Sequence, residues 1–134
     1  MTSFNSEYFK KNVFSKEQVS GYLASALRDL EIASKDNVAE VRFTFAYQAF
    51  LKAAITCVAA RGYKARSVQG HHIRLIETLS DLLKDPDIFT FGNAMRMKRN
   101  EDLYGDGGIV SKKEADEYLE FVKSVLRKVE RSLK

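Results

Sequence analysis

The sequence predicts an all-α protein that folds as an up-and-down antiparallel bundle of four to five helices. Two capping boxes, in which a serine is followed three residues later by Gln or Glu, predict helix starts at Ser15 and Ser111. Apolar residues at helical spacing follow both serines, and glycine or proline separates the other periodic segments. The 134 residues suffice to bury roughly two-thirds of the unfolded surface in one core, so residues 1–134 are predicted to form a single domain. No segment predicts a strand.

The N-terminal residues 1–14 are polar with aromatic residues between them, which indicates either a short helix or an arm laid over the core. The first predicted helix of the bundle begins at Ser15 and ends near residues 34–36. Its buried face carries an apolar row at helical spacing, formed by Val19, Tyr22, Leu23, Ala26, Leu27 and Leu30.

The second helix is predicted to begin at Asp36 or Asn37 and to run to Arg61, where Gly62 supplies a stop signal. It carries two apolar rows: Val38, Val41, Phe45 and Ala49 on one side, and Phe43, Tyr47, Phe50, Ala54 and Cys57 on the other. Because two apolar faces must be covered from two sides, this helix is predicted to lie at the centre of the bundle. Because Cys57 belongs to the second apolar row, it is predicted to be a buried structural thiol.

The remaining chain is predicted to contain a basic loop and three further helices. Residues 62–70 form the loop, and the third helix follows with His71, His72 and Arg74 in its first turn. Pro86 is suited to the first position of the fourth helix, which runs to Tyr104. The glycines in residues 105–108 favour a helix-breaking turn over a phosphate loop, because no strand precedes them and no Gly-Lys-Ser/Thr follows. The last helix starts after Ser111.

Composition and cysteine count are those of an ordinary cytoplasmic protein. The chain is 45% hydrophobic and 30% charged, with a formal charge of +4 that makes phosphate-bearing partners somewhat more probable. Cys57 is alone, and no signal peptide or uninterrupted membrane-spanning run is present, so we expect a reduced compartment and no membrane association. His71 and His72 are adjacent on a helix and point about 100° apart, which argues against a shared metal site. We expect no metal and no cofactor.

The segment AMRMKRNEDLYG, residues 94–105, is the best candidate for function. In a helix, Arg96, Arg99, Asn100 and Tyr104 fall within one arc of less than half the circumference. Arg99 also continues the apolar row Ile88, Phe91 and Met95. A guanidinium in that position is always charged and needs an anionic or carbonyl partner. The partner is either a ligand or an internal carboxylate, for which Glu77, Glu101 and Asp102 are candidates.

A wider basic surface is predicted if the third and fourth helices are neighbours. It would combine Arg61, Lys64, Arg66, Arg74, Arg96, Lys98 and Arg99, with Tyr63, Phe91 and Tyr104 as stacking partners for single-stranded nucleic acid. Two separately solvated basic faces are the alternative. Of the two histidines, His72 is the better candidate for a functional role.

Two segments and the capped C-terminal helix resemble the HEPN superfamily (higher eukaryotes and prokaryotes nucleotide-binding domains). The segments read FAYQAFLKAAITCVAARGYKARSVQGHHIRLIETL and RMKRNEDLYGDGG, and the feature that carries the resemblance is Arg99 and Asn100 followed by Tyr104. The resemblance covers nearly the whole chain from Ser15 onward. It implies an α-bundle that pairs into a homodimer, with the arginine motifs of both subunits lining a shared cleft.

The resemblance also bears on activity. Some members are metal-independent ribonucleases that act as toxins beside a nucleotidyltransferase antitoxin, and in those Arg stabilises the phosphate while His serves the ribose 2′-hydroxyl or leaving oxygen. Here Tyr104 stands where His is expected, and a phenol with a pKa of about 10 is a poor base near neutrality. We therefore expect binding of RNA or a nucleotide phosphate in preference to cleavage, as one half of a toxin–antitoxin pair. The alternative is a non-catalytic module that docks a nucleotidyltransferase or another helical partner.

Overall fold

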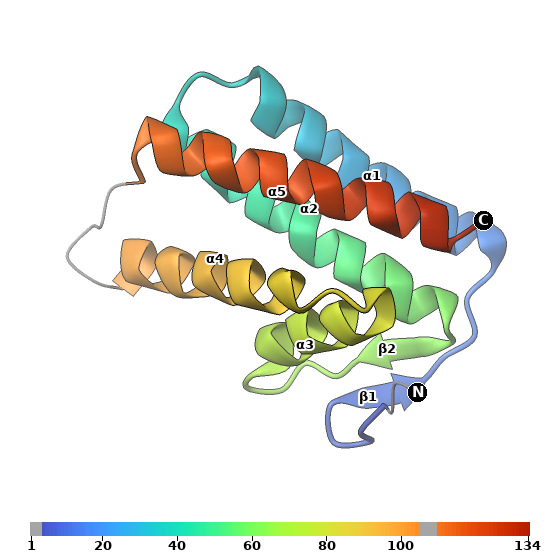
Figure 1. The fold of residues 1–134 in the computed structure, drawn as a ribbon. Coiled ribbons are helices and arrows are strands. Elements are labelled where there is room, and N and C mark those ends of the chain that lie inside the picture. The colour runs from blue at the N-terminus through green and yellow to red at the C-terminus, as the bar shows by residue number, and fades with distance from the viewer. Residues whose placement is uncertain (1–3, 105–109) are drawn as a thin grey trace.

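The computed structural model describes the backbone of residues 4–104 and 110–134, and the side chains of residues 4–100 and 110–134. Its five helices are α1 (Lys16–Lys35), α2 (Ala39–Ala60), α3 (His71–Leu83), α4 (Pro86–Tyr104) and α5 (Lys112–Ser132). Helices α2, α3 and α5 run in one direction along the bundle and α1 and α4 run in the other, so the up-and-down alternation is interrupted between α2 and α3, which β2 connects (Figure 1). The predicted all-α bundle is therefore confirmed. The predicted turn at residues 105–108 lies outside the described residues.

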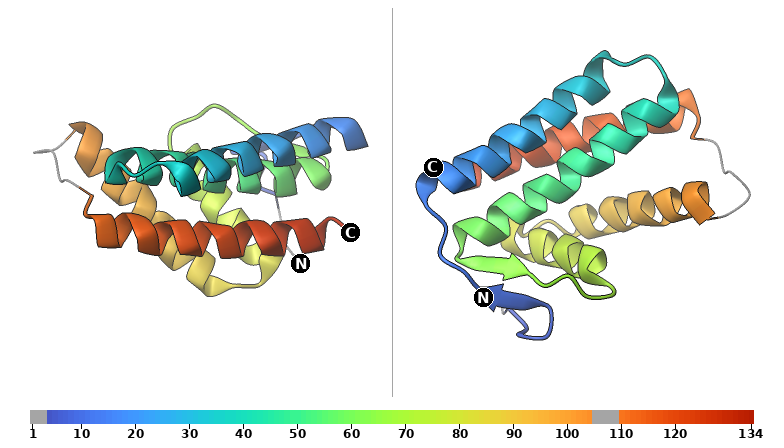
Figure 2. Two further views of the ribbon diagram at one scale, coloured as in Figure 1. Left: turned by 90° about the horizontal axis from the view of Figure 1, so that it is seen from above. Right: turned by 180° about the vertical axis from the view of Figure 1, so that it is seen from behind.

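Helix α2 is the centre of the bundle, as its two apolar rows predicted. It contacts each of the other four helices, and Figure 2 shows it enclosed between α1, α5 and the α3–α4 pair. One of its predicted rows is buried throughout, namely Phe43, Tyr47, Phe50, Ala54 and Cys57. The helix starts two to three residues later than predicted, because Val38 is its N-cap and is 56% exposed.

Local signals in the sequence set the helix ends. In the first capping box, Gln18 N donates to Ser15 Oγ at 3.1 Å and Ser15 N donates to Gln18 Oε1 at 2.8 Å. The second box, Ser111 with Glu114, has both reciprocal bonds as well. Gly62 follows α2 with a φ of 83°, a left-handed conformation that favours glycine. Pro86 is the first residue of α4, as predicted.

The prediction that the chain contains no strand is wrong. Residues Phe9–Lys11 (β1) pair antiparallel with Tyr63–Ala65 (β2), with Lys10 opposite Lys64. β1 lies in the segment expected to be a helix or an arm, and β2 lies in the segment expected to be a loop. Both strands have three residues, which is too short for an alternating pattern to be recognised. Phe9 is 5% exposed and joins the main core, so β1 packs against the bundle.

Hydrogen bonds and ion pairs between helices, and a close helix contact at Gly92, fix the positions of the helices relative to one another. Arg42 donates to the carbonyl of Ala33 (Nε, 2.9 Å) and pairs with Asp116, which ties α2 to the end of α1 and to α5. Lys52 Nζ lies 2.6 Å from the buried Asp29 carboxylate of α1. At Gly92, α4 comes so close to the core that a β-carbon would lie 2.4 Å from the Phe50 ring.

Among the described residues, α2 is the one helix whose length and composition would suffice to cross a membrane. Of its most apolar window, 61% is buried inside the bundle. A helix of this length and composition also occurs in the cores of soluble proteins.

Candidate functional site

Helix α4 carries Arg99 to the edge of the core. Ile88 and Met95, which precede Arg99 in the predicted apolar row, are 1% and 0% exposed. Arg99 itself is half-buried, and its guanidinium carbon lies 5.8 Å from the centre of the Tyr47 ring on α2. A cation over an aromatic face at this distance is a favourable contact. Phe91 departs from the row, since it is 48% exposed and lies against Phe121 of α5.

His72 approaches the same place from α3. Its ring meets the Tyr47 ring edge to face, with centres 6.4 Å apart, and the neighbouring His71 ring is at 4.4 Å. Burial lowers the pKa of His72 below its ordinary value, and the charges of His71, Arg99 and Arg96 lower it further. The imidazole is therefore neutral near pH 7, in contrast to the guanidinium groups beside it.

A depression of about 310 Å³ brings the predicted residues of the two helices together. Its lining includes His72 at the start of α3 and both Arg96 and Asn100 of α4. Arg96 Nε donates to Asn93 Oδ1 at 2.9 Å, which orients the guanidinium along α4. No carboxylate belongs to the described part of the lining, so the depression, hereafter the α3–α4 depression, is cationic.

The first turn of α3 adds backbone donors to the α3–α4 depression. Its N-cap is Gly70, which has a φ of 82° and no side chain to cap the helix. The backbone N–H groups of His72 and Ile73 donate to no described residue, and both residues line the depression. Unpaired N–H groups at a helix N-terminus, together with the helix dipole, favour an anion.

Of the three internal carboxylates expected as partners for Arg99, the structure describes the side chain of Glu77 alone. Glu77 pairs with Arg74 at 3.1 Å, within α3. Glu101 and Asp102 have side chains outside the described residues, and so has Tyr104, the third member of the predicted motif. Among the side chains that the structure describes, no carboxylate forms an ion pair with Arg99.

The wider basic surface is only partly assembled. Helices α3 and α4 are neighbours, as the prediction required. However, Arg66 donates to the carbonyl of Ser6 at 2.9 Å, and Arg74 lies 4.6 Å above the Tyr8 ring, so both are held by the N-terminal segment. Lys98 points toward Glu114 of α5 at 3.6 Å. Of the stacking partners, Tyr63 is already stacked on Phe4, with ring centres 4.0 Å apart.

Tyr47 is the residue of this site that the sequence did not single out. Its side chain is 1% exposed, and its hydroxyl has no hydrogen-bond partner among the described residues. Burial raises the pKa of Tyr47 to about 12, although Arg99 and Arg96 act in the opposite direction. The one available signal was a lone hydroxyl within the apolar row Phe43, Tyr47, Phe50. That signal is weak, since buried tyrosines are common in cores.

Other candidate chemistry is not assembled in the described part of the chain. No group of three or more His, Cys, Asp or Glu side chains there is placed to hold a metal ion. Cys57 is fully buried, and burial raises the pKa of its thiol, which suits the structural role predicted for it.

No family model, curated protein or solved structure matches this chain significantly. Its functional assignment therefore depends on the geometry of the α3–α4 depression and on the sequence resemblance.

Proposed function

We propose that this chain is a HEPN-like helical protein that binds RNA or a nucleotide through its phosphate in the α3–α4 depression. The observation that carries the proposal is the meeting of the uncapped N-terminus of α3 with Arg96 and Asn100 of α4. A phosphate there accepts hydrogen bonds from backbone N–H groups and a charge-assisted bond from the guanidinium. Arg99, half-buried over Tyr47, adds a second positive charge at the edge of the site.

We favour binding over cleavage because Tyr104 stands where the ribonucleases of this family have a histidine. His72, on α3, could supply an imidazole in its place. A neutral imidazole beside a bound phosphate can accept a proton from a ribose 2′-hydroxyl. This role would require His72 to lie within hydrogen-bond reach of the hydroxyl. Metal-independent ribonuclease activity is therefore the second outcome to be measured, and not the proposal.

The proposal is tested by the affinity of a fluorescein-labelled single-stranded RNA and of AMP for the wild-type protein and two variants. Arg96→Ala should weaken binding about 10- to 100-fold, because it removes a charge-assisted contact worth about 1.5–3 kcal/mol, and Arg99→Ala should weaken it about three- to tenfold, because it removes a positive charge at the edge of the site. Arg127→Ala, an exposed arginine of α5, loses the same charge elsewhere and should bind as wild type. Urea denaturation checks that all variants fold.

Equal affinities for all three arginine variants would refute the proposed site. Gel analysis of the same RNA, with chelator present, measures cleavage. RNA degradation by the wild type that is lost in Arg99→Ala and His72→Gln would instead assign an enzyme.

We further propose that the protein pairs as a homodimer through α4. Phe91 and Met97 are 48% and 51% exposed on the helix that carries Arg96 and Arg99, and aromatic residues and methionine are enriched at protein interfaces. Sedimentation equilibrium should show a dimer for the wild type and a monomer for Met97→Glu. Val13→Glu, which alters a residue that is 94% exposed elsewhere, should remain dimeric. A monomeric wild type at high concentration would refute this part.

A further inference from the structure

A second cavity lies between α1, α2, β2 and α3, and it differs in character from the α3–α4 depression. Its volume is about 310 Å³, which is at the lower end for small-molecule sites. It shares His71 and His72 with the depression but contains none of Arg96, Arg99 or Asn100. Its described lining holds no carboxylate.

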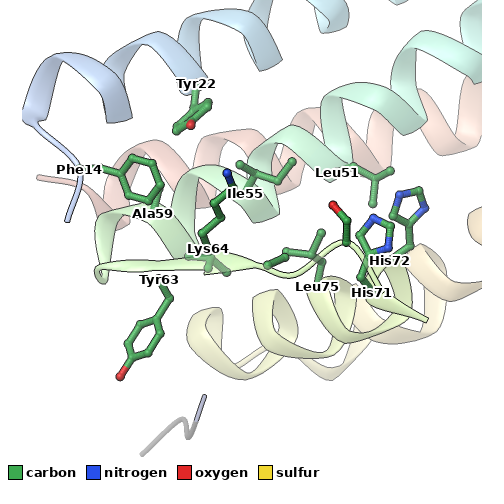
Figure 3. Close-up of a pocket in the computed structure, with 13 residues that line it drawn as sticks. Phe14, Tyr22, Leu51, Ile55, Ala59, Tyr63, Lys64, His71, His72 and Leu75 are labelled. Atoms are coloured by element: carbon green, nitrogen blue, oxygen red, sulfur yellow. The ribbon is translucent and has the colours of Figure 1, made fainter. Parts of the chain in front are cut away.

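The floor and ends of this cavity are apolar and aromatic. Val58, Ala59 and Leu75 are nearly fully buried and form its floor. At one end the rings of Phe14 and Tyr22 meet edge to face, with centres 5.7 Å apart, and at the other lie the two imidazoles (Figure 3). Aromatic rings that present both edges and faces favour an aromatic guest.

The cavity mouth is cationic because of Lys64. Figure 3 shows the Lys64 side chain directed from β2 toward the α2 side of the cavity, whereas Tyr63 is turned the other way. Lys64 forms no ion pair with any residue that the structure describes. Across the sheet it stands directly opposite Lys10, and two like charges in that arrangement repel. A bound anion at Lys64 would relieve the repulsion.

We propose that this cavity binds a small aromatic carboxylate, with its ring on the apolar floor and its carboxylate at the Lys64 ammonium. The cavity is hereafter the aromatic-acid pocket. The ring would be held by burial and by the aromatic ends, and the carboxylate by the Lys64 ammonium in the lining, while Tyr22 and Ser67 supply hydroxyl groups in the same lining. A neutral ring would lack the ammonium contact, and a saturated chain would lack the aromatic ones.

The test uses naphthylacetate as the probe and amide chemical shifts of the full chain as the readout. Saturable shifts are expected at Ile55, Ala59 and Leu75. Lys64→Gln should weaken binding about three- to tenfold, the range for a partly exposed charge contact. The neutral analogue naphthylacetamide should lose a similar factor with the wild type. Lys113→Gln, an equal charge change in the first turn of α5, should bind as the wild type does.

A second variant tests the location without disturbing the core. Ser67 is exposed and lines the mouth, so Ser67→Trp should block the pocket and abolish the shifts while the fold is retained. No saturable shift with naphthylacetate, or equal affinity for Lys64→Gln and Lys113→Gln, would overturn the proposal. Tighter binding of octanoate than of naphthylacetate would overturn the aromatic assignment.

Binding of naphthylacetate to the aromatic-acid pocket can be tested separately from binding of a phosphate to the α3–α4 depression. Arg96→Ala and Arg99→Ala should bind naphthylacetate with wild-type affinity, because neither arginine belongs to the aromatic-acid pocket. Loss of RNA binding in those variants with naphthylacetate binding retained would support both sites separately.

Discussion

At the scale of single residues, the ring of Tyr47 is well packed but its hydroxyl lacks a hydrogen-bond partner. Its ring fills the core between α2, α3 and α4, yet its hydroxyl is buried with no hydrogen-bond partner among the described residues. A buried hydroxyl without a partner costs about 1–3 kcal/mol of stability. Such a group is kept either for its ring or because a ligand pairs with it.

Tyr47→Phe separates the ring from the hydroxyl. Because the ring remains and an unpaired polar atom is removed, the free energy of unfolding should stay the same or rise by about 1 kcal/mol. Urea denaturation followed by circular dichroism measures it. Tyr118→Phe, whose phenol is only partly buried, is the control and should change little. A loss above about 1 kcal/mol would show that the Tyr47 hydroxyl has a structural partner.

His72 predicts a pH dependence of stability. Since its folded-state pKa is lowered below the unfolded value of about 6.5, the unfolded chain binds more protons in that range, and stability must fall as pH decreases through it. His71, Arg96 and Arg99 face this imidazole, and Tyr47 lies beneath it, so no described anion offsets the effect. Carboxylates titrate at lower pH.

We expect the wild type to lose stability between about pH 7 and 5, and His72→Gln to lose less over the same interval. His71→Gln should keep most of the pH dependence of stability, because the burial of His72 is the larger cause of its lowered pKa and is unchanged in this variant. Unfolding free energies at several pH values provide the measurement. A slope that is the same in wild type and His72→Gln would contradict the assignment.

At the scale of elements, the sequence predicted those parts of the candidate site that lie within a single helix. Helical spacing alone placed Arg96, Arg99 and Asn100 on one arc, and the position of the only two histidines singled out His72. What joins them depends on how α3 packs on α4, which no spacing within either helix specifies. Gly70 is the one local signal for the anion site, since a glycine in the N-cap position leaves the N-terminus of α3 without a side-chain acceptor.

The packing of α4 depends on Gly92. A β-carbon there would lie 2.4 and 2.6 Å from atoms of the Phe50 ring and 2.9 Å from Ile76. Both neighbours are fully buried, so they have little room to move. The glycine therefore allows α4 to lie against α2 and α3 at the distance that forms the α3–α4 depression.

Gly92→Ala should lower the free energy of unfolding by about 1–3 kcal/mol, because overpacking outweighs the gain in helix propensity. Gly21→Ala is the matched control. Gly21 also lies within a helix, but its β-carbon would meet nothing within 4 Å, so the substitution should stabilise by about 0.5–1 kcal/mol. Equal effects of the two substitutions in urea denaturation would refute the role given to Gly92.

At the scale of the whole molecule, the helices were predictable and the sheet was not. Capping boxes, Pro86 and Gly62 act within a few residues, so the sequence shows them directly. The pairing of β1 with β2 instead joins residues more than 50 positions apart and involves three residues on each side, as in Phe9 opposite Ala65. Because a two-stranded pair is marginally stable by itself, the burial of Phe9 and the contacts of Arg66 and Arg74 with the N-terminal segment support the pairing.

Phe9→Ala tests whether the N-terminal segment belongs to the fold or is merely laid on it. Phe9 is 5% exposed and meets the Phe4 ring edge to face at 5.4 Å, so its removal should cost about 3–4 kcal/mol and loosen β1 from β2. Lys10→Ala changes the next residue of the same strand. Its side chain is exposed and opposite Lys64, so stability should change by less than about 0.5 kcal/mol.

Urea denaturation gives both values, and hydrogen exchange at the β2 amides reports the pairing itself. If Phe9→Ala were as mild as Lys10→Ala, residues 1–14 would be a separable arm. If it is severe, the segment closes the bundle at the end where β2 borders the aromatic-acid pocket. The same substitution should then weaken naphthylacetate binding, because Lys64 depends on the paired strand for its position.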